Sequence, residues 1–319
     1  AKSFMERHKI PTAKYKTFTK IKDAHRYINE EGAPIVIKAD GLAAGKGVVV
    51  AMTVQEALVA VDSMLEDNLF GDAGARVVIE EFLTGEEVSF IVICDGNSIL
   101  PLASSQDHKR LLDLDLGPNT GGMGAYSPAP IVTPELHRKI MSEVIEPTTE
   151  GMKKDGIEFS GFLYAGLMID KDNNIKTLEF NCRMGDPETQ PILFRLKSDL
   201  FEILLAAANK DIKNYEAKWE VGSAITVVIA ADNYPNQPKI NDEILNYNNN
   251  NKDAYVFHAG TILKNKRIYT AGGRVLGVTA KGDSLKNAQE MAYALVKKIE
   301  FNGMQYRADI GNKALMKDL

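Results

Sequence analysis

The stretch Leu178–Gln190 combines acidic, basic and amide side chains, and it begins with the pattern of a β-strand. Side chains two residues apart in a strand point to the same face, so Glu179 and Asn181 present two oxygen donors side by side while Phe180 turns toward the core. Mg²⁺ prefers oxygen ligands and leaves part of its coordination to water and phosphates. Arg183 follows, and its planar guanidinium suits a phosphoryl group. The stretch predicts a site for a nucleoside triphosphate and a divalent metal, although the Glu-x-Asn pair alone fits a solvated strand edge better.

A second phosphate-type element lies far upstream in the sequence. Lys38 ends a predicted strand, and the loop of small residues after it contains Gly41, Gly45, Lys46 and Gly47. Glycines let the backbone approach an anion closely, and the backbone amides can then donate to phosphate oxygens. The loop therefore predicts a phosphate cradle, and a hairpin turn with solvated lysines is the alternative.

Two better-known phosphate loops do not match this segment. A Walker loop needs a wider glycine spacing, a Ser or Thr after its lysine and a helix directly behind it. Here Gly47 follows Lys46, and a strand comes next. A dinucleotide fingerprint also lies between a strand and a helix. A glycine-rich loop between two strands instead predicts a cover that folds over phosphates.

The third element is the end of the strand predicted at 76–81, with the sequence Glu80-Glu81-Phe82-Leu83. Backbone groups at such a strand end can pair with the edge of an adenine without any special side chain. Glu87 lies just beyond and can accept hydrogen bonds from ribose hydroxyls. The alternative is a solvated cluster of glutamates, and only its position after the glycine loop favours the binding interpretation.

The composition is that of a globular protein with a weakly acidic balance. The chain has 319 residues, a net charge of −5 and two cysteines, Cys94 and Cys182. Its length predicts about two domains. An acidic chain is a poor candidate for nucleic-acid binding, which needs a basic surface. No apolar run is long enough to cross a membrane, and no signal peptide is visible. Two cysteines in apolar runs predict buried free thiols and a cytoplasmic location.

The elements that must position these groups alternate between strands and helices. Thr133-Pro134 predicts a helix start, and Pro147 predicts a kink or break in that helix. The Gly-, Asn- and Pro-rich segment 116–130 predicts a long ordered loop. Further helices are expected before residue 11, at 21–31, from 53, from 199 and from 284, and strands at 34–38, 47–51, 76–81, 89–94, 99–103, 163–169, 176–181, 224–231, 256–261, 268–270 and 274–280.

Lys38 with its glycine loop, then Glu80–Leu83, then the Glu179-x-Asn181 pair occur in the order seen in the ATP-grasp superfamily. Longer blocks are similar to the glycinamide ribonucleotide synthetase family, which is also called phosphoribosylamine–glycine ligase. These blocks are residues 37–48, 105–110 (Ser-Gln-Asp-His-Lys-Arg), 117–128, 181–190, 257–261 (Phe-His-Ala-Gly-Thr) and 272–276 (Gly-Gly-Arg-Val-Leu). The resemblance covers essentially the whole chain.

The resemblance implies an α+β protein with the ATP-grasp fold. Its small lid subdomain and its central mixed or antiparallel sheet with helices would be followed by a small C-terminal α/β domain. The expected divisions are an N-terminal helix at 1–10, the lid at 11–85, the central catalytic domain at 86–220 and the C-terminal domain at 221–319. The family carries a further N-terminal domain of roughly 100 residues. Because this chain begins almost at the lid, we expect a truncated chain or one that lacks that domain.

The family joins glycine to 5-phosphoribosylamine at the expense of ATP in purine biosynthesis, through glycyl phosphate. The resemblance implies roles for the following residues: catalytic Arg183 and Lys46; ATP-binding Lys38, Lys46, Glu80, Glu81, Phe82, Leu83 and Glu87; metal-binding Glu179 and Asn181 for Mg²⁺ or Mn²⁺; and substrate-binding Asn119, Thr120, Gly121, Gly122, Met123, Gly124, Asp186 and Glu188. His108 is expected to be structural or to contact substrate, because this chemistry needs no strong base.

One departure and several alternatives remain open at this point. The position where many ATP-grasp enzymes carry a second metal-binding carboxylate falls near Leu167, in an apolar strand. We therefore expect few protein ligands to the metal. Another ATP-grasp carboxylate–amine ligase, or a nucleotide-binding fragment without turnover, would share most of these features. The expected partners are the two small substrates, without nucleic acid or membrane, in a monomer or weak homodimer.

Overall fold

The computed structural model describes residues 1–41, 47–65, 76–247 and 251–316. The chain forms two compact units. The first unit comprises Ala1–Glu86 with Met168–Leu178, and the second comprises Glu87–Leu167 with Glu179–Leu319. Within the described ranges no helix is both long and apolar enough to cross a membrane.

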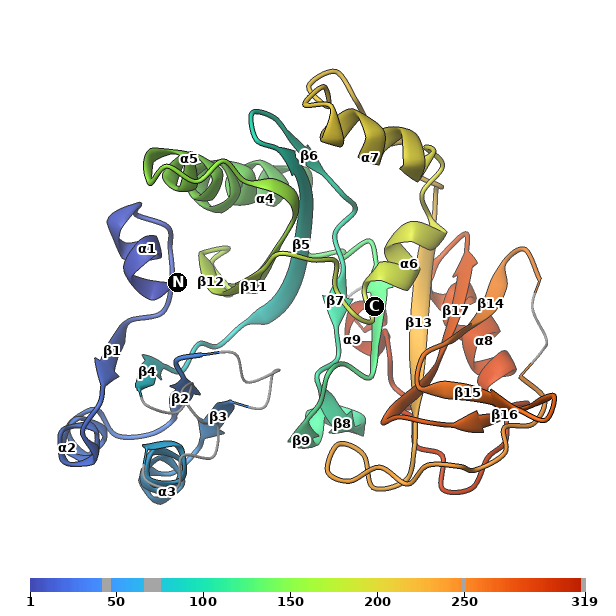
Figure 1. Cartoon of the computed structure of the whole chain (residues 1–319), viewed down its shortest axis with the longest axis horizontal. Coiled ribbons are helices and arrows are strands. Elements are labelled where there is room, and N and C mark those ends of the chain that lie inside the picture. Colours follow the sequence, from blue (N-terminus) through green and yellow to red (C-terminus); the bar gives the residue numbers. More distant parts are fainter. Residues whose placement is uncertain (42–46, 66–75, 248–250, 317–319) are drawn as a thin grey trace. The chain divides into compact units, whose positions relative to one another are not determined.

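The first unit is a four-stranded antiparallel sheet covered by helices. Its strands are ordered β1-β4-β2-β3. The helices α2 and α3 lie next to each other on one face of this sheet (Figure 1). The bounds are α1 (Lys2–Arg7), β1 (Tyr15–Phe18), α2 (Ile21–Glu31), β2 (Ile35–Ala39), β3 (Val48–Ala51), α3 (Val54–Leu65) and β4 (Val77–Glu81).

Local sequence explains how this unit forms. In β2 the alternate residues Ile35 and Ile37 are buried, and they share a core with Ala57 and Val61 of α3. A capping box starts α3, where a helix was expected: the Thr53 hydroxyl accepts from the Glu56 amide at 3.2 Å, and the Glu56 carboxylate accepts from the Thr53 amide. The alternation that buries Ile37 places Lys38 on the opposite face of the sheet.

The second unit contains two larger sheets and two short strand pairs. The five-stranded sheet is ordered β14-β17-β13-β10-β7, and the four-stranded sheet is ordered β12-β11-β5-β6. Strands β5, β11 and β12 each have one end that belongs to the first unit. The strand bounds are β5 (Glu86–Asp95), β6 (Ile99–Pro101), β7 (Gln106–Asp107), β8 (Arg110–Leu112), β9 (Leu116–Asn119), β10 (Gly124–Ser127), β11 (Ser160–Ile169), β12 (Ile175–Asn181), β13 (Ser223–Ala230), β14 (Ala254–His258), β15 (Thr261–Lys264), β16 (Arg267–Thr270) and β17 (Arg274–Gly282).

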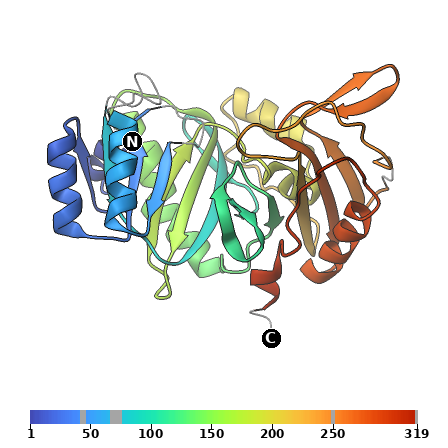
Figure 2. The same cartoon turned by 90° about the horizontal axis from the view of Figure 1, so that it is seen from below.

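Helices cover both faces of the five-stranded sheet. Figure 2 shows α8 lying along the sheet, where Ala288 and Ala292 pack against Val227 and Val278 in the core. Helix α6 contacts β10, β13 and β17, and its Gln190 reaches Gly277 on the face away from α8. The helix bounds are α4 (Pro134–Ile140), α5 (Glu146–Lys154), α6 (Thr189–Phe194), α7 (Leu200–Ala208), α8 (Leu285–Val296) and α9 (Asn312–Leu315).

Most of the expected elements are confirmed, but the strand expected at 256–261 is divided, because β14 ends at His258 and β15 begins at Thr261. The segment 116–130 is not a continuous loop, because β9 and β10 form within it. The helix does not break at Pro147: a π-helical turn at Met141–Ile145 separates α4 from α5, and the backbone stays helical at Ile145 and Glu146. Both cysteines are free thiols, but only Cys94 is buried; Cys182 is exposed because it lies past the end of β12.

Candidate active site

Lys38 lies on β2 of the first unit and is held by a buried carboxylate. Its Nζ is 3.0 Å from Oε2 of Glu80 and 3.4 Å from the carbonyl oxygen of Leu178, the residue directly before Glu179 in the sequence. Glu80 is only 3% exposed, and Nζ of Lys2 lies 2.9 Å from the same carboxylate oxygen. Burial lowers the pKa of Lys2, and the Glu80 charge opposes that shift. The sequence analysis did not identify Lys2, because only the fold brings it to Glu80.

The neighbouring Glu81 has a structural side chain. Its carboxylate accepts from the Lys14 amide at 2.9 Å and from Lys176 Nζ at 3.1 Å. Burial favours the protonated acid, but these hydrogen bonds outweigh it and lower the pKa of Glu81. Phe82 and Leu83 follow the end of β4, as expected for a strand-end connection. Lys46 lies outside the described residues.

Glu179 and Asn181 lie at the end of β12, and their side chains are adjacent as the strand pattern predicted. The Asn181 amide nitrogen is 3.4 Å from Oε1 of Glu179, and the Glu179 side chain is exposed. Arg183 is also exposed and donates to the Met184 carbonyl at 2.8 Å. One carboxylate and one amide oxygen are hard donors that fit a cation sharing its coordination with phosphates and water. In the described part of the chain no group of three or more His, Cys, Asp or Glu is placed to hold a metal.

A lysine that no local pattern marks lies against Glu87, one of the expected site carboxylates. Lys109 Nζ is 2.7 Å from Oε2 of Glu87. Burial alone would favour the neutral amine, but the charges of Glu87 and Glu179 outweigh burial and raise the pKa of Lys109. Lys109 is therefore a fixed cation in this group. The only sequence signal for it was its place in the Ser-Gln-Asp-His-Lys-Arg block.

The loop between β9 and β10 carries the residues expected to bind substrate. The Thr120 amide and hydroxyl donate to the Lys109 carbonyl at 2.7 and 2.9 Å, and the Gly122 amide donates to the Thr120 hydroxyl. Asn119 is exposed, whereas the Met123 side chain is fully buried. The loop is thus tied to the segment that holds Lys109, and Gly124, the next residue, is buried at the start of β10.

His108 is buried and serves the packing of this segment. Its Nδ1 lies 3.2 Å from the Gly124 carbonyl oxygen, and its Nε2 accepts from the Gly311 amide at 3.4 Å. Burial, followed by the charge of Arg307, lowers the pKa of His108 to about 4. A neutral imidazole with both nitrogens engaged agrees with the structural role favoured from the sequence.

Asp186 and Glu188 occupy opposite environments although they are two residues apart. Glu188 is 2% exposed, and its Oε1 accepts from the Ser89 hydroxyl at 2.8 Å and from the Tyr164 hydroxyl at 3.0 Å. Burial and the nearby Glu188 charge raise the pKa of Asp107. Asp107 was not identified from the sequence. Two carboxylates in one low-dielectric place favour the arrival of a cation, such as a substrate ammonium.

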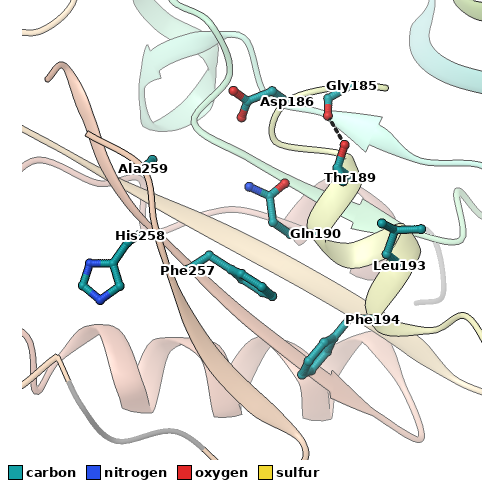
Figure 3. Close-up of a pocket in the computed structure, with 9 residues that line it drawn as sticks. All are labelled: Gly185, Asp186, Thr189, Gln190, Leu193, Phe194, Phe257, His258 and Ala259. Atoms are coloured by element: carbon teal, nitrogen blue, oxygen red, sulfur yellow. Dashed lines mark hydrogen bonds between the residues drawn. The ribbon is translucent and has the colours of Figure 1, made fainter. Parts of the chain in front are cut away.

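Asp186 instead faces a hollow along α6. Figure 3 shows its carboxylate at one end of a cavity of about 500 Å³, with the Gln190 amide projecting between α6 and β14. Phe194 and Phe257 form the apolar end of the cavity, with their ring centroids 6.4 Å apart. Oε1 of Gln190 is buried and has no hydrogen-bond partner among the described residues. A second cavity of about 200 Å³ shares Asp186 and Gln190. A small polar molecule therefore has space, a carboxylate and an amide available here.

Comparison with known proteins places this arrangement in a family. Residues 1–189 match the family model "Phosphoribosylglycinamide synthetase, ATP-grasp (A) domain", and residues 224–313 match the model of the C domain. Phosphoribosylamine–glycine ligase of Ralstonia nicotianae is 61% identical over 99% of this chain and 75% of its own length. The enzyme of the same name from Pseudomonas aeruginosa is 55% identical, with 99% of this chain and 74% of its own length covered.

Solved structures agree on the fold. Phosphoribosylamine–glycine ligase from Thermotoga maritima has a TM-score of 0.88 at 34% identity, covering 97% of this chain and 77% of that one. A biotin carboxylase domain from Hydrogenobacter thermophilus has a TM-score of 0.73 at 17% identity over 96% of this chain and 66% of that one, a likeness of fold alone. The expected ATP-grasp fold is confirmed. The chain belongs to the phosphoribosylglycinamide synthetase family, with an ATP-grasp domain followed by the family's C domain.

Proposed function

We propose that the chain is an ATP-dependent ligase that joins glycine to 5-phosphoribosylamine and forms glycinamide ribonucleotide, ADP and phosphate in purine biosynthesis. The observation that carries the proposal is the adjacent pair Glu179 and Asn181, followed by the exposed Arg183, in a chain whose relatives bear the name phosphoribosylamine–glycine ligase. A carboxylate–amine ligase needs positioning and charge neutralisation around a transferring phosphoryl group, and these residue types supply both.

ATP and a divalent metal are assigned by residue chemistry. Lys38 is proposed to hold phosphates, the backbone of Glu80–Leu83 to hold adenine and Glu87 to accept from ribose; Lys46 has a phosphate role by sequence alone. Glu179 and Asn181 are proposed to hold Mg²⁺, with Mn²⁺ as the alternative. When bound, the metal supplies charge neutralisation at the phosphates. Lys38 keeps its ammonium in place through Glu80, so its charge is already oriented.

The chain's own residues explain how the carboxylate becomes reactive. A carboxylate resists attack by an amine, and transfer of the γ-phosphoryl group to glycine gives glycyl phosphate, which has a good leaving group. Arg183 is proposed to stabilise the charge on the transferring group. Asp107 and the buried Glu188 are proposed to bind the glycine ammonium, because an added cation would offset the repulsion between the two carboxylates.

The second substrate is larger and carries several hydroxyls. The cavity of about 500 Å³ beside Asp186 and Gln190 is proposed to receive phosphoribosylamine, whose hydroxyls can donate to the carboxylate and to the unpartnered amide oxygen. The amine nitrogen then attacks the glycyl carbonyl, and phosphate leaves. The protein is proposed to be a monomer or weak homodimer, which sedimentation tests. It is proposed to lie in the cytoplasm, which cell fractionation tests.

The test is a pair of substitutions on the natural polypeptide that contains residues 1–319. ADP release is measured with glycine and with phosphoribosylamine generated from ribose 5-phosphate and ammonia. Glu179→Gln and Arg183→Met are expected to lower kcat/KM by roughly 100-fold or more, because each removes charge stabilisation at the phosphoryl group. The control is Glu202→Gln, which changes an exposed glutamate on α7 and should leave the rate unchanged.

Other outcomes would identify the competing functions. Turnover only with a different carboxylate or amine would indicate another ligase of this fold. Nucleotide binding without turnover under any pair of substrates would indicate a binding module, and rates that survive both substitutions would remove the proposed roles of Glu179 and Arg183.

A further inference from the structure

Arg274 begins β17, inside the Gly-Gly-Arg-Val-Leu block, and has no role in the proposed chemistry. Its guanidinium lies among acceptors from two separate loops. Nη1 donates to the carbonyl oxygens of Gly121 and Asp186, both at 2.8 Å, and to that of Gly122 at 3.4 Å. Nη2 donates to Oδ2 of Asp186 at 2.8 Å. One side chain thus joins the β9–β10 loop to the turn before α6.

Hydrogen bonds hold both the amide and the carbonyl of Gly121 in this loop. The Gly121 amide donates to the Tyr234 hydroxyl at 2.9 Å, on the side of the residue opposite to its carbonyl. A Cβ on Gly121 would lie 3.0 Å from Cζ of Arg274. Arg274 and Tyr234 therefore hold both polar groups of one residue, and neither could be recognised as a partner from sequence spacing.

The same guanidinium sets the direction of the Asp186 carboxylate. The Arg274 side chain is 22% exposed and that of Asp186 is 63% exposed. The arginine is therefore packed among its neighbours, while the carboxylate is accessible to solvent. Both residues line the cavity of about 200 Å³, and Asp186 also lines the larger one. The second carboxylate oxygen, Oδ1, has no hydrogen bond to Arg274 and remains available to a molecule in these cavities.

We propose that Arg274 is a positioning residue for the phosphoribosylamine site. It acts through Asp186 and through the Gly121–Gly122 carbonyls, and it holds both loops in the arrangement that receives the hydroxyls of this substrate. The role uses the charge and the planar fork of donors of arginine, of which lysine keeps only the charge. The inference rests on the proposed function, because it assigns the cavities beside Asp186 to phosphoribosylamine.

The experiment compares Arg274→Met and Arg274→Lys with the parent polypeptide in the ADP-release assay. Arg274→Met is expected to raise the KM for phosphoribosylamine roughly tenfold or more, the effect of losing hydrogen bonds to a charged group. The KM for glycine and the affinity for ATP should change less than about threefold, since their proposed contacts lie on other residues. Arg274→Lys keeps the charge and should recover part of the loss.

A matched control and a double substitution separate positioning from general damage. Arg267→Met removes an exposed arginine on β16 that pairs with Glu243 at 3.0 Å, and it should leave every KM unchanged. If Arg274 acts through Asp186, Asp186→Asn should raise the KM for phosphoribosylamine by a smaller factor in the Arg274→Met background than in the parent.

The possible failures are distinguishable. Absence of turnover by the parent polypeptide would overturn the proposed function and this inference with it. An active parent in which Arg274→Met behaves like Arg267→Met would overturn the inference alone. The same holds if all three KM values rise equally and Arg274→Lys restores nothing, because that pattern indicates loss of structure.

Discussion

Gly122 occupies a place where a side chain does not fit, and this explains its residue type at the candidate site. Its φ is +112°, and a Cβ would lie 2.4 Å from Cδ of Pro187 and 2.7 Å from Oδ1 of Asp107. At the residue scale, the loop thus approaches Pro187 and the Asp107 carboxylate through bare backbone. Residue type marks these glycines as loop formers, but only the fold determines which atoms they approach.

A pair of glycine substitutions tests this explanation. Gly122→Ala is expected to lower the free energy of unfolding by about 3 kcal/mol, because backbone strain and overpacking add. Gly156→Ala has a similar positive φ of +80° with nothing within 4 Å of the added Cβ, so it should cost only about 1 kcal/mol. Urea unfolding of both variants measures the difference, and equal losses would show that crowding around Gly122 is unimportant.

At the scale of elements, His108 joins three segments of the second unit: the end of β7, the start of β10 and the turn before α9. The charged groups facing its ring are Arg307, Lys313 and Asp309. Arg307 is fully buried and bonds Asp309 and Asp115, so its cation is fixed near the imidazole. The histidine is therefore neutral in the folded protein, and protonation opposes the packing of these segments.

This arrangement predicts a loss of stability in mild acid. The folded-state pKa of His108, about 4, is below the ordinary value of about 6.5. Between these two pKa values the unfolded chain binds more protons than the folded one. The stabilisation from neutral His108 is therefore fully present above the unfolded-state pKa and is lost as the pH falls toward the folded-state pKa. Between pH 7 and pH 5 the free energy of unfolding of the parent should fall by about 2 kcal/mol more than that of His108→Gln.

Urea unfolding at the two pH values checks this prediction. His258→Gln, at an exposed position, serves as the control and should keep the parent's acid-dependent loss. A His108→Gln variant with the parent's full pH dependence would contradict the assignment.

Element prediction succeeded where the pattern was local and missed where pairing was distant. Thr133 caps α4 through its side chain, as the Thr-Pro signal indicates, because a cap involves residues a few positions apart. The segment 116–130 has the composition of a loop, yet β10 pairs with β13 about a hundred positions later, with Gly124 opposite Val227. A distant strand supplied the hydrogen bonds that its own composition did not indicate.

At the scale of the whole molecule, the two units have separate cores. Ile37 belongs to the core of the first unit, and Ile229 belongs to the core between β13 and α8 in the second. Both side chains are fully buried among residues of their own unit. Each unit can therefore open with its own free energy. The family models divide the chain differently, because the model for residues 1–189 covers all of the first unit and residues 87–167 of the second, and the other model covers 224–313. The finer division at residues 10, 85 and 220 stays a prediction.

Matched core substitutions test this independence. Ile37→Ala and Ile229→Ala should each cost about 2–5 kcal/mol, because each leaves a cavity among buried side chains. Hydrogen exchange measured by mass spectrometry should rise in peptides of the first unit for Ile37→Ala and in the five-stranded sheet for Ile229→Ala. Increased exchange throughout the chain in both variants would show a single cooperative unit.

The sequence by itself determined most helix starts and the chemical groups of the site, because capping and the Glu179-x-Asn181 spacing are properties of neighbouring residues. The tertiary structure alone decided which groups meet. It pairs Lys38 with the buried Glu80, brings Lys109 to Glu87 and joins residues 121 and 186 through Arg274. These contacts depend on strand register and on packing between segments far apart in the chain, which local patterns do not specify.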